Sequence, residues 1–273
     1  MITLVGMVRD EAKYLAEWLA YHWLVGFESF LIFLHDCQDD SEAQIARLPF
    51  PVTTVSVTGA QLGWALKNET YAAGLAQVTT PWAACLDIDE FLFFPQHENV
   101  TAFLLQPQFQ SASAIAVYQN IFGACGHENS PPGLVTQNYT RRNADAVLAG
   151  DVAYPQYRQP RDLFKAVKML VRPADVIKVR DSHKFLCKRL TVDETGEPFK
   201  QYNICRHMAN VRLNHYFTKS REDWAFKTAR ARLSGAQPYP DTWFEYFAAQ
   251  TTIDTALADC FSAKLQAVLA HGS

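Results

Sequence analysis

The first 90 residues alternate between short apolar runs and longer segments with helical periodicity, and this alternation constrains the fold most strongly. The apolar runs cover residues 2–8, 30–34, 52–57 and 82–86, and each suits a buried strand. The segments between them, residues 11–25, 41–48 and 64–77, are predicted helices. Alternating strands and helices predict an α/β fold, with a largely parallel sheet and helices on both of its faces.

The second half of the chain is less regular. Strands are predicted at residues 112–118, 167–171, 176–179 and 211–217, and Ser220 and Asp223 form a capping pair for a helix that ends near Leu233. A last amphipathic helix is predicted at residues 253–269. Its apolar stripe consists of Ile253, Leu257, Phe261, Leu265 and Leu269. We expect this stripe to pack on its own domain, with a second copy or a membrane surface as alternatives.

Composition limits the possible partners. Hydrophobic residues make up 49% of the 273 residues, which is enough for a sizeable core, and the net charge of -3 argues against nucleic acid as a partner. Basic residues do gather in the middle third of the chain, where they form either a solvated face or the lining of an anionic pocket. They are Arg141, Arg142, Arg158, Arg161, Lys165, Lys168 and Arg172.

Cysteine usage and hydropathy bear on localisation. None of the six cysteines forms a C-x-x-C pair, which predicts a reducing compartment rather than a disulfide framework. The apolar N-terminal run reaches Arg9 too soon for a signal peptide, and no apolar stretch approaches the ~20 residues that span a bilayer. We therefore expect a soluble, cytoplasmic protein, and leave peripheral contact with the inner face of a membrane as an alternative.

Acidic residues follow three of the predicted strands. Arg9-Asp10-Glu11 follows the first strand, residues 36–39 contain two acids after the second, and Asp87-Ile88-Asp89 follows the fourth. In open parallel sheets, ligands bind beyond the carboxyl ends of the strands. The coincidence of three acidic strand ends is stronger evidence for a binding site than any one of them.

The Asp87-Ile88-Asp89 segment suggests what that site binds. On an extended chain, residues two apart point to the same face, so we expect both carboxylates on one side of the strand. Two carboxylates so placed attract a hard divalent cation such as Mg²⁺ or Mn²⁺, which is the chemistry required to hold a diphosphate. The alternative for Asp-x-Asp alone is a solvated strand end without an ion.

Four segments together resemble a known family. They are residues 8–22, with Glu17-Trp18 and Tyr21-His22; residues 86–91, Leu-Asp-Ile-Asp-Glu-Phe; residues 120–127, with Phe-Gly-x-x-Gly-His; and residues 213–220, with Asn-His-Tyr. In these segments the chain resembles nucleotide-diphospho-sugar glycosyltransferases of the GT-A fold, and most of all the family 2 and family 92 group. Asp10 stands where that group usually has Asn. The matches run in family order from residue 3 to about residue 233.

The resemblance implies a GT-A (Rossmann-like) domain over residues 1–235, with a nucleotide-binding half (1–118), an acceptor-binding half (119–235) and a C-terminal helical extension (236–273). It also implies a metal-dependent, inverting hexosyltransferase. Such an enzyme would move a sugar from a nucleotide donor, with UDP-sugars favoured, to a glycan or lipid-linked acceptor in polysaccharide or glycoconjugate biosynthesis.

The resemblance also assigns the metal ligands. Asp89 would bind the ion directly, and Asp87 would face the ribose or a metal-bound water. His215 would be the third protein ligand, and its imidazole favours Mn²⁺ over Mg²⁺.

Contacts to the nucleotide are expected from the other strand ends. Glu11 and Asp36 would contact the nucleotide, with Arg9 beside Glu11 and Asp39 as a second candidate after Asp36. Two lysines are phosphate candidates. Lys67 either reaches a phosphate or is a solvated helix lysine, and Lys219 is the better candidate because it follows His215 closely.

An inverting enzyme needs a base to deprotonate the acceptor hydroxyl. The candidates are His127, Glu128, Asp181 and His183, and we place Glu128 first because it follows a strand that should run toward the acceptor.

Two other functions fit the acidic strand ends. One is a metal-dependent nucleotidyltransferase or phosphohydrolase, although no G-x-G-x-x-G or Walker-type loop occurs in the chain. The other is a non-catalytic module that binds nucleotide sugars.

Overall fold

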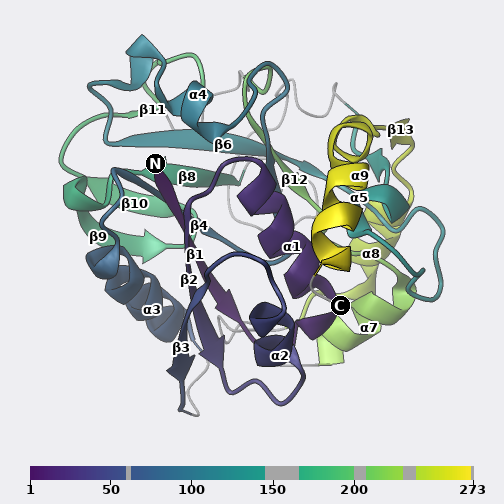
Figure 1. The fold of residues 1–273 in the computed structure, drawn as a ribbon. Helices are drawn as coiled ribbons and strands as arrows, with labels where there is room; N and C mark the ends of the chain where they lie inside the picture. The colour runs from purple at the N-terminus through teal and green to yellow at the C-terminus, as the bar shows by residue number, and fades with distance from the viewer. Residues whose placement is uncertain (60–62, 145–165, 200–206, 230–237, 272–273) are drawn as a thin grey trace.

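One curved sheet forms the centre of the computed structural model, which describes residues 1–59, 63–144, 166–199, 207–229 and 238–271 (Figure 1). Its strands run in the order β3-β2-β1-β4-β8-β6-β12-β5, and β11 pairs with β6 at the side. Their bounds are β1 Ile2–Val8, β2 Ser29–His35, β3 Thr53–Val57, β4 Trp82–Leu86, β5 Glu90–Phe93, β6 Ala114–Ile121, β8 Val167–Val171, β11 Thr191–Val192 and β12 Arg212–His215.

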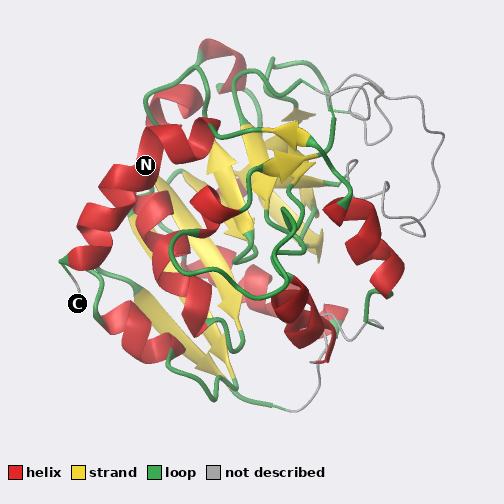
Figure 2. Cartoon of the chain, turned by 90° about the vertical axis from the view of Figure 1, so that its right-hand side faces the viewer, coloured by secondary structure: helices red, strands yellow, loops and turns green. Residues whose placement is uncertain are grey.

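Helices cover both faces of this sheet (Figures 1 and 2). The longer ones are α1 Ala12–Leu24, α3 Trp64–Gln77, α7 Arg221–Ala229, α8 Asp241–Ala248 and α9 Ala256–Ala270. The short ones are α2 Ser41–Ala46, α4 Val100–Leu104 and α5 Val135–Asn138. The predicted mixed α/β class is confirmed.

The first half of the chain forms the parallel part of the sheet. Strands β3, β2, β1 and β4 pair in parallel, and Val5 at the centre of β1 lies opposite Leu31 of β2 and Cys85 of β4. All seven residues of β1 are buried. One of its faces packs in the core that contains α1, and the other packs against Tyr71 and Leu75 of α3. This burial on both faces explains why the strand sequence is a continuous apolar run.

The second half contains antiparallel pairings that periodicity did not reveal. β8 is antiparallel to both β4 and β6, and β12 is parallel to β6 but antiparallel to β5. β5 itself was not predicted, because residues 90–93 follow β4 so closely that they read as a continuation of it. The predicted strand at 211–217 is shorter, Arg212–His215, and the one at 112–118 is shifted to Ala114–Ile121.

The C-terminal helix α9 packs on the main domain. Leu257 and Leu265 are buried in the same core as α1, and the rings of Tyr21 and Phe261 lie 5.2 Å apart. The expectation that this stripe packs on its own domain is therefore confirmed. Its predicted start is wrong, because Ile253 is extended in β13 (Thr252–Ile253) and pairs with β7 (Arg141–Arg142).

The basic residues of the middle third do not form one described pocket. Arg142 bonds to Asp254, Lys168 is buried beside Asp87, and the guanidinium of Arg172 lies 4.2 Å from the centroid of the Trp82 ring. Arg158, Arg161 and Lys165 lie outside the described residues. Among the described helices, none is long and apolar enough to cross a membrane.

Candidate functional site

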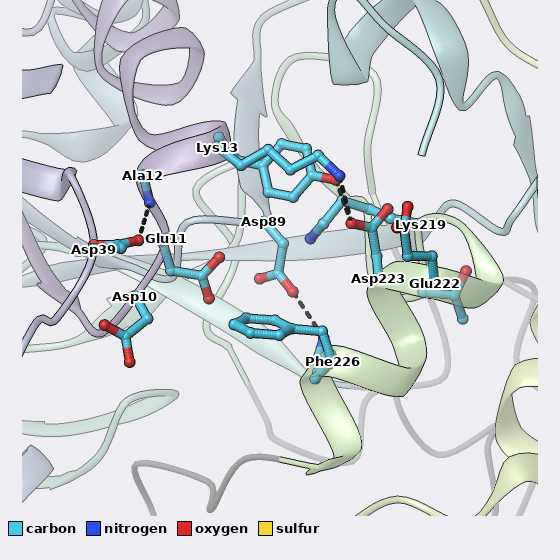
Figure 3. Close-up of a pocket in the computed structure, with 13 residues that line it drawn as sticks. Asp10, Glu11, Ala12, Lys13, Asp39, Asp89, Lys219, Glu222, Asp223 and Phe226 are labelled. Carbon is cyan, nitrogen blue, oxygen red and sulfur yellow. Dashed lines mark hydrogen bonds and ion pairs between the residues drawn. The ribbon is translucent and has the colours of Figure 1, made fainter. Parts of the chain in front are cut away.

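A cavity of about 370 Å³ lies between the carboxyl ends of the parallel strands and helix α7 (Figure 3). Six carboxylic acids line it: Asp10, Glu11, Asp39, Asp89, Glu222 and Asp223. Three lysines line it as well, Lys13, Lys219 and Lys227, together with Ala12, Tyr14, Thr218 and Phe226. The acidic ends of β1, β2 and β4 therefore meet in one place, as the sequence predicted.

The Asp87-Ile88-Asp89 segment is a turn rather than the end of a strand. β4 ends at Leu86, and the N–H of Glu90 donates to the carbonyl of Asp87 as β5 begins. The premise that Asp87 and Asp89 point the same way on an extended chain is therefore wrong. Each carboxylate has its own set of partners, on different sides of the turn.

Asp87 belongs to a buried ionic cluster with Lys67, Lys168 and Glu90, which we call the Lys168 cluster. Lys67 Nζ lies 2.7 Å from Asp87 Oδ1, and Lys168 Nζ lies 2.9 Å from Asp87 Oδ2 and 3.1 Å from Glu90 Oε2. The Lys168 side chain is 1% exposed. Burial acts to raise the pKa of Asp87, but the two ammonium groups outweigh it and hold that pKa well below its usual range.

Lys67 is therefore not a solvated helix lysine, which was one of the two interpretations of this residue. Its side chain is 10% exposed and bound to Asp87. Binding a phosphate would require Lys67 to leave that carboxylate.

Asp89 faces the cavity. Its Oδ2 accepts from Lys227 Nζ at 2.9 Å, and its Oδ1 lies 3.4 Å from Nε2 of His215. Burial opposes ionisation of Asp89, but the nearby Lys227 ammonium outweighs it and holds the pKa of Asp89 well below its ordinary value. The predicted meeting of Asp89 with His215, 126 positions later in the sequence, is confirmed. It arises because β12 pairs with β5 and places His215 opposite Glu90.

When the His215 ring is neutral, its contact with Gln119 favours the tautomer that suits a metal ligand. Its Nδ1 lies 2.9 Å from the side-chain carbonyl oxygen of Gln119, which can only accept, so Nδ1 carries the proton in the neutral ring. Nε2 then keeps its lone pair and points to Asp89. Within the described residues, however, no three His, Cys, Asp or Glu side chains are arranged to hold a metal ion together. Two of the three predicted donors meet, whereas Asp87 is engaged by lysines.

The connection from β1 to α1 forms the opposite wall. Asp10 has a φ of 52°, a left-handed conformation that Asn and Asp tolerate better than most residues, so Asp can stand where the family has Asn. Its carboxylate accepts from the N–H of Gln38 at 2.7 Å, and Asp39 accepts from the N–H of Ala12 at 2.8 Å. Asp39, rather than Asp10, thus satisfies the first turn of α1.

Two predicted nucleotide contacts lie apart from the cavity lining. Asp36 is beside His35, with 3.5 Å between its Oδ2 and the His35 Nε2, and Arg9 precedes Asp10 at the end of β1. Neither lines the cavity, whereas Glu11 and Asp39 do.

Helix α7 contributes a wall that sequence reasoning largely missed. Ser220 and Asp223 form the predicted capping pair, because each backbone N–H donates to the other side chain. Asp223 also accepts from Lys13 at 3.1 Å and from the Tyr14 hydroxyl at 2.5 Å. Lys219, with a φ of 54°, holds its ammonium 4.7 Å from the Tyr14 ring centroid. The Ser-x-x-Asp spacing was the available signal for Asp223.

The Gly loop that precedes Glu128 does not bring the two base candidates into the cavity lining. A Cβ on Gly123 would lie 2.0 Å from the carbonyl oxygen of Phe247, and Gly126 has a φ of 81°, so both positions require glycine. His127 is 3.2 Å from the carbonyl of Asn138, and the carbonyl of Glu128 accepts from the N–H of Glu222. Glu222, not Glu128, reaches the cavity.

Asp181 and His183 form a turn between β9 (Val176–Asp181) and β10 (Lys184–Cys187). The Asp181 carboxylate accepts from the N–H of His183 at 2.7 Å, and His183 Nδ1 lies 3.0 Å from the carbonyl of Val167. Burial and the nearby Lys168 lower the pKa of His183 to about 3, so this ring is neutral at physiological pH. It lies beside the Lys168 cluster and does not line the cavity.

The comparisons with known proteins agree with these motifs. No family model matches the chain. The chain is 27% identical over 161 residues to a glycosyltransferase family 92 protein of Oryza sativa subsp. japonica, and 28% identical over 145 residues to one of Ricinus communis. The chain resembles the family 92 glycosyltransferases. The alignments cover 56% and 50% of this chain but 27% and 25% of the two relatives, so it spans about a quarter of their length.

Solved structures give weaker similarities. TarS 1-349 of S. aureus, in complex with UDP-GlcNAc, has a TM-score of 0.44 at 10% identity, over 96% of this chain and 74% of TarS. Glucosyl-3-phosphoglycerate synthase of Mycobacterium tuberculosis, in complex with Mn²⁺ and UDP-glucose, has a TM-score of 0.32 at 17% identity, over 44% and 43% of the two chains.

Proposed function

We propose that this protein is a metal-dependent, inverting glycosyltransferase that takes a sugar from a nucleoside-diphosphate donor, with UDP-sugars favoured, and transfers it to a glycan or lipid-linked acceptor. The observation that carries the proposal is the cavity itself. It brings Asp89, which contacts His215, together with three lysines beyond the carboxyl ends of the parallel strands.

The lining fits a divalent cation together with a diphosphate. Carboxylic acids outnumber lysines by six to three in this cavity, so a diphosphate alone would meet mainly like charge. Asp89 and the unprotonated Nε2 of His215 would hold the cation, with Mn²⁺ favoured over Mg²⁺ by the imidazole. Bound there, the cation would neutralise the charge that develops on the diphosphate leaving group.

The remaining residues would bind and orient the donor. Lys219 is placed to contact the phosphates, and Glu11 and Asp39 to contact the nucleoside, because all three line the cavity. Asp87 would contact the ribose while Lys168 keeps it ionised. Gln119 would hold His215 in the tautomer that presents Nε2.

The acceptor base is a choice between two glutamates. Asp223 is already occupied as an acceptor, because Lys13, Tyr14 and Ser220 all donate to its carboxylate. Glu222 lines the cavity, and the backbone carbonyl of Glu128 accepts a hydrogen bond from the N–H of Glu222. Of the variants Glu222→Gln and Glu128→Gln, the one at the base should lose about 10²-fold or more in turnover while nucleotide binding stays unchanged. Equal, small losses in both would remove these two residues from consideration.

Calorimetric titration with UDP and with GDP, each with and without Mn²⁺, tests the function. We expect one nucleotide to bind in the presence of Mn²⁺. Incubation with the matching sugar nucleotide should then release the nucleoside diphosphate when an acceptor is added. Release of inorganic phosphate or pyrophosphate would instead indicate a phosphohydrolase or nucleotidyltransferase. If neither UDP nor GDP bound with Mn²⁺ present, the proposed function would be wrong.

A further inference from the structure

Lys227, a residue that no motif singled out, stands between the cavity and Asp89. It comes from the second turn of α7, and its Nζ donates to Asp89 Oδ2 at 2.9 Å and to the carbonyl of Phe217 at 2.7 Å. The same ammonium lies 4.1 Å from the centroid of the Phe217 ring. The side chain is 22% exposed and lines the cavity.

This contact conflicts with direct binding of a metal by Asp89. One oxygen of the carboxylate faces Nε2 of His215, and the other already has a cation on it. A metal ion that binds both Asp89 and His215 must therefore compete with Lys227. Removing a partner from a charge in so enclosed a place is costly unless another partner replaces it.

A diphosphate is a replacement of the right charge. Lysine is a compact cation on a flexible stem with three donors, so it can turn about its packed stem to a neighbouring anion without a change in the helix. Lys219 lines the same cavity, which gives a diphosphate a second ammonium group to approach. Lys13 also lines the cavity but is held by Asp223, on the side away from Asp89.

We propose that Lys227 exchanges partners when the donor binds: it holds Asp89 until a nucleoside diphosphate enters, then turns to the phosphate oxygens and frees Asp89 for the divalent cation. The inference rests on the proposed function and adds to it a donor-binding residue and an order of events. Without nucleotide, the Lys227 ammonium competes with the metal ion for Asp89. The metal and the nucleotide therefore bind together rather than separately.

Binding of Mn²⁺ alone, followed by electron paramagnetic resonance, tests the competition without any nucleotide. In the variant Lys227→Met the competing cation is gone, so we expect Mn²⁺ to bind about tenfold more tightly than in the wild-type protein, within the 5–150-fold range of typical coupling energies. UDP without metal should bind more weakly to this variant, because one phosphate contact is lost. The effect of UDP on Mn²⁺ affinity should therefore shrink.

Two further variants keep the test specific. Lys13→Met removes an equal charge from the same cavity, and we expect it to change Mn²⁺ affinity by about threefold at most, because its charge is farther away and screened. Lys227→Gln keeps most of the side-chain length and replaces Lys227→Met should the latter fail to fold. Adding Asp89→Asn to either Lys227 variant should abolish the gain.

Two results separate failure of this inference from failure of the proposed function. If the Lys227 variants bound Mn²⁺ no more tightly than the wild type, or if Lys13→Met produced the same gain, the exchange would be overturned even though UDP still bound with Mn²⁺. If the wild type bound neither UDP nor GDP with Mn²⁺, the proposed function and the exchange would both be lost.

Discussion

Asp87 and Asp89 are two positions apart, yet they lie in regions with opposite properties. Asp87 belongs to the Lys168 cluster, in which its carboxylate contacts Lys67 and Lys168, and Lys168 also contacts Glu90. Asp89 lies at the cavity with Lys227 and His215. Lys227 also contacts a backbone carbonyl and an aromatic ring, and His215 also contacts the Gln119 amide and lies 4.0 Å from Glu90. Asp87 is held by two lysines and does not line the cavity, whereas Asp89 lines the cavity beside Lys227. Under the proposed function, the acidic motif therefore divides into a structural half and a ligand-binding half.

Removing Lys168 should have the largest effect on stability. Its side chain is 1% exposed, and Lys168→Met would leave the buried Glu90 without its lysine and the partly exposed Asp87 with Lys67 alone. Breaking one side of a buried ion pair costs about 3–5 kcal/mol. Urea unfolding followed by circular dichroism would measure this loss. A loss below about 1 kcal/mol would contradict the division, because Asp87 would then not depend on the cluster.

Asp89→Asn should have the reverse profile. We expect binding of UDP with Mn²⁺ to fall by about 100-fold, since an anionic ligand of the cation is lost. The free energy of unfolding should fall by about 2 kcal/mol or less, because the asparagine oxygen still accepts from Lys227. Calorimetry and urea unfolding on the same protein measure the two quantities. Asp259→Asn, at an exposed position of α9 away from the cavity, is the control and should change neither. A loss of stability as large as that of Lys168→Met would place Asp89 in the structural half.

The Lys168 cluster should also respond to pH through His183. Burial and Lys168 lower the pKa of His183 to about 3, below its ordinary value, so the unfolded chain binds a proton that the folded protein excludes. The stabilising contribution is complete above the unfolded pKa of about 6.5 and is lost as the pH falls toward 3. The loss is at most about 1.4 kcal/mol per pH unit over that window. In His183→Asn this part of the pH dependence should vanish, and an unchanged pH profile of unfolding would contradict the assignment.

Sequence reasoning located the site because it depended on topology. Continuous apolar runs such as residues 2–8 specify buried parallel strands, and parallel strands bring their carboxyl ends to one edge, so the acids after these strands could be expected together from the sequence alone. Glu11, Asp39 and Asp89 do line one cavity, whereas Asp36, the first choice after β2, does not. His215 was found through the Asn-His-Tyr segment, and β12 brings it to Asp89 as expected.

The partners of these residues could not be predicted in the same way. Lys227 reaches Asp89 across 138 positions, and Lys168 reaches Asp87 across 81. Both contacts depend on how α7 and β8 pack, and β8 enters the sheet antiparallel, which local periodicity does not reveal. A buried lysine has no sequence signature of its own. Glu222 was not among the predicted base candidates for a similar reason, because its place in the cavity lining depends on how α7 packs.

Lys67→Met should have the smallest effect on stability, and it tests whether a residue of the Lys168 cluster also takes part in donor binding. Lys67 is the more exposed of the two lysines in the Lys168 cluster, with a side chain that is 10% exposed and an ammonium 5.7 Å from the Tyr71 ring centroid. Because Asp87 would keep Lys168, we expect a loss of about 1 kcal/mol in the free energy of unfolding, roughly that of one hydrogen bond. If Lys67 also contacts the donor phosphates, UDP affinity should fall in this variant, whereas in a purely structural role it should not. Urea unfolding and UDP titration with Mn²⁺ would therefore show whether Lys67 has only a structural role or also contributes to donor binding.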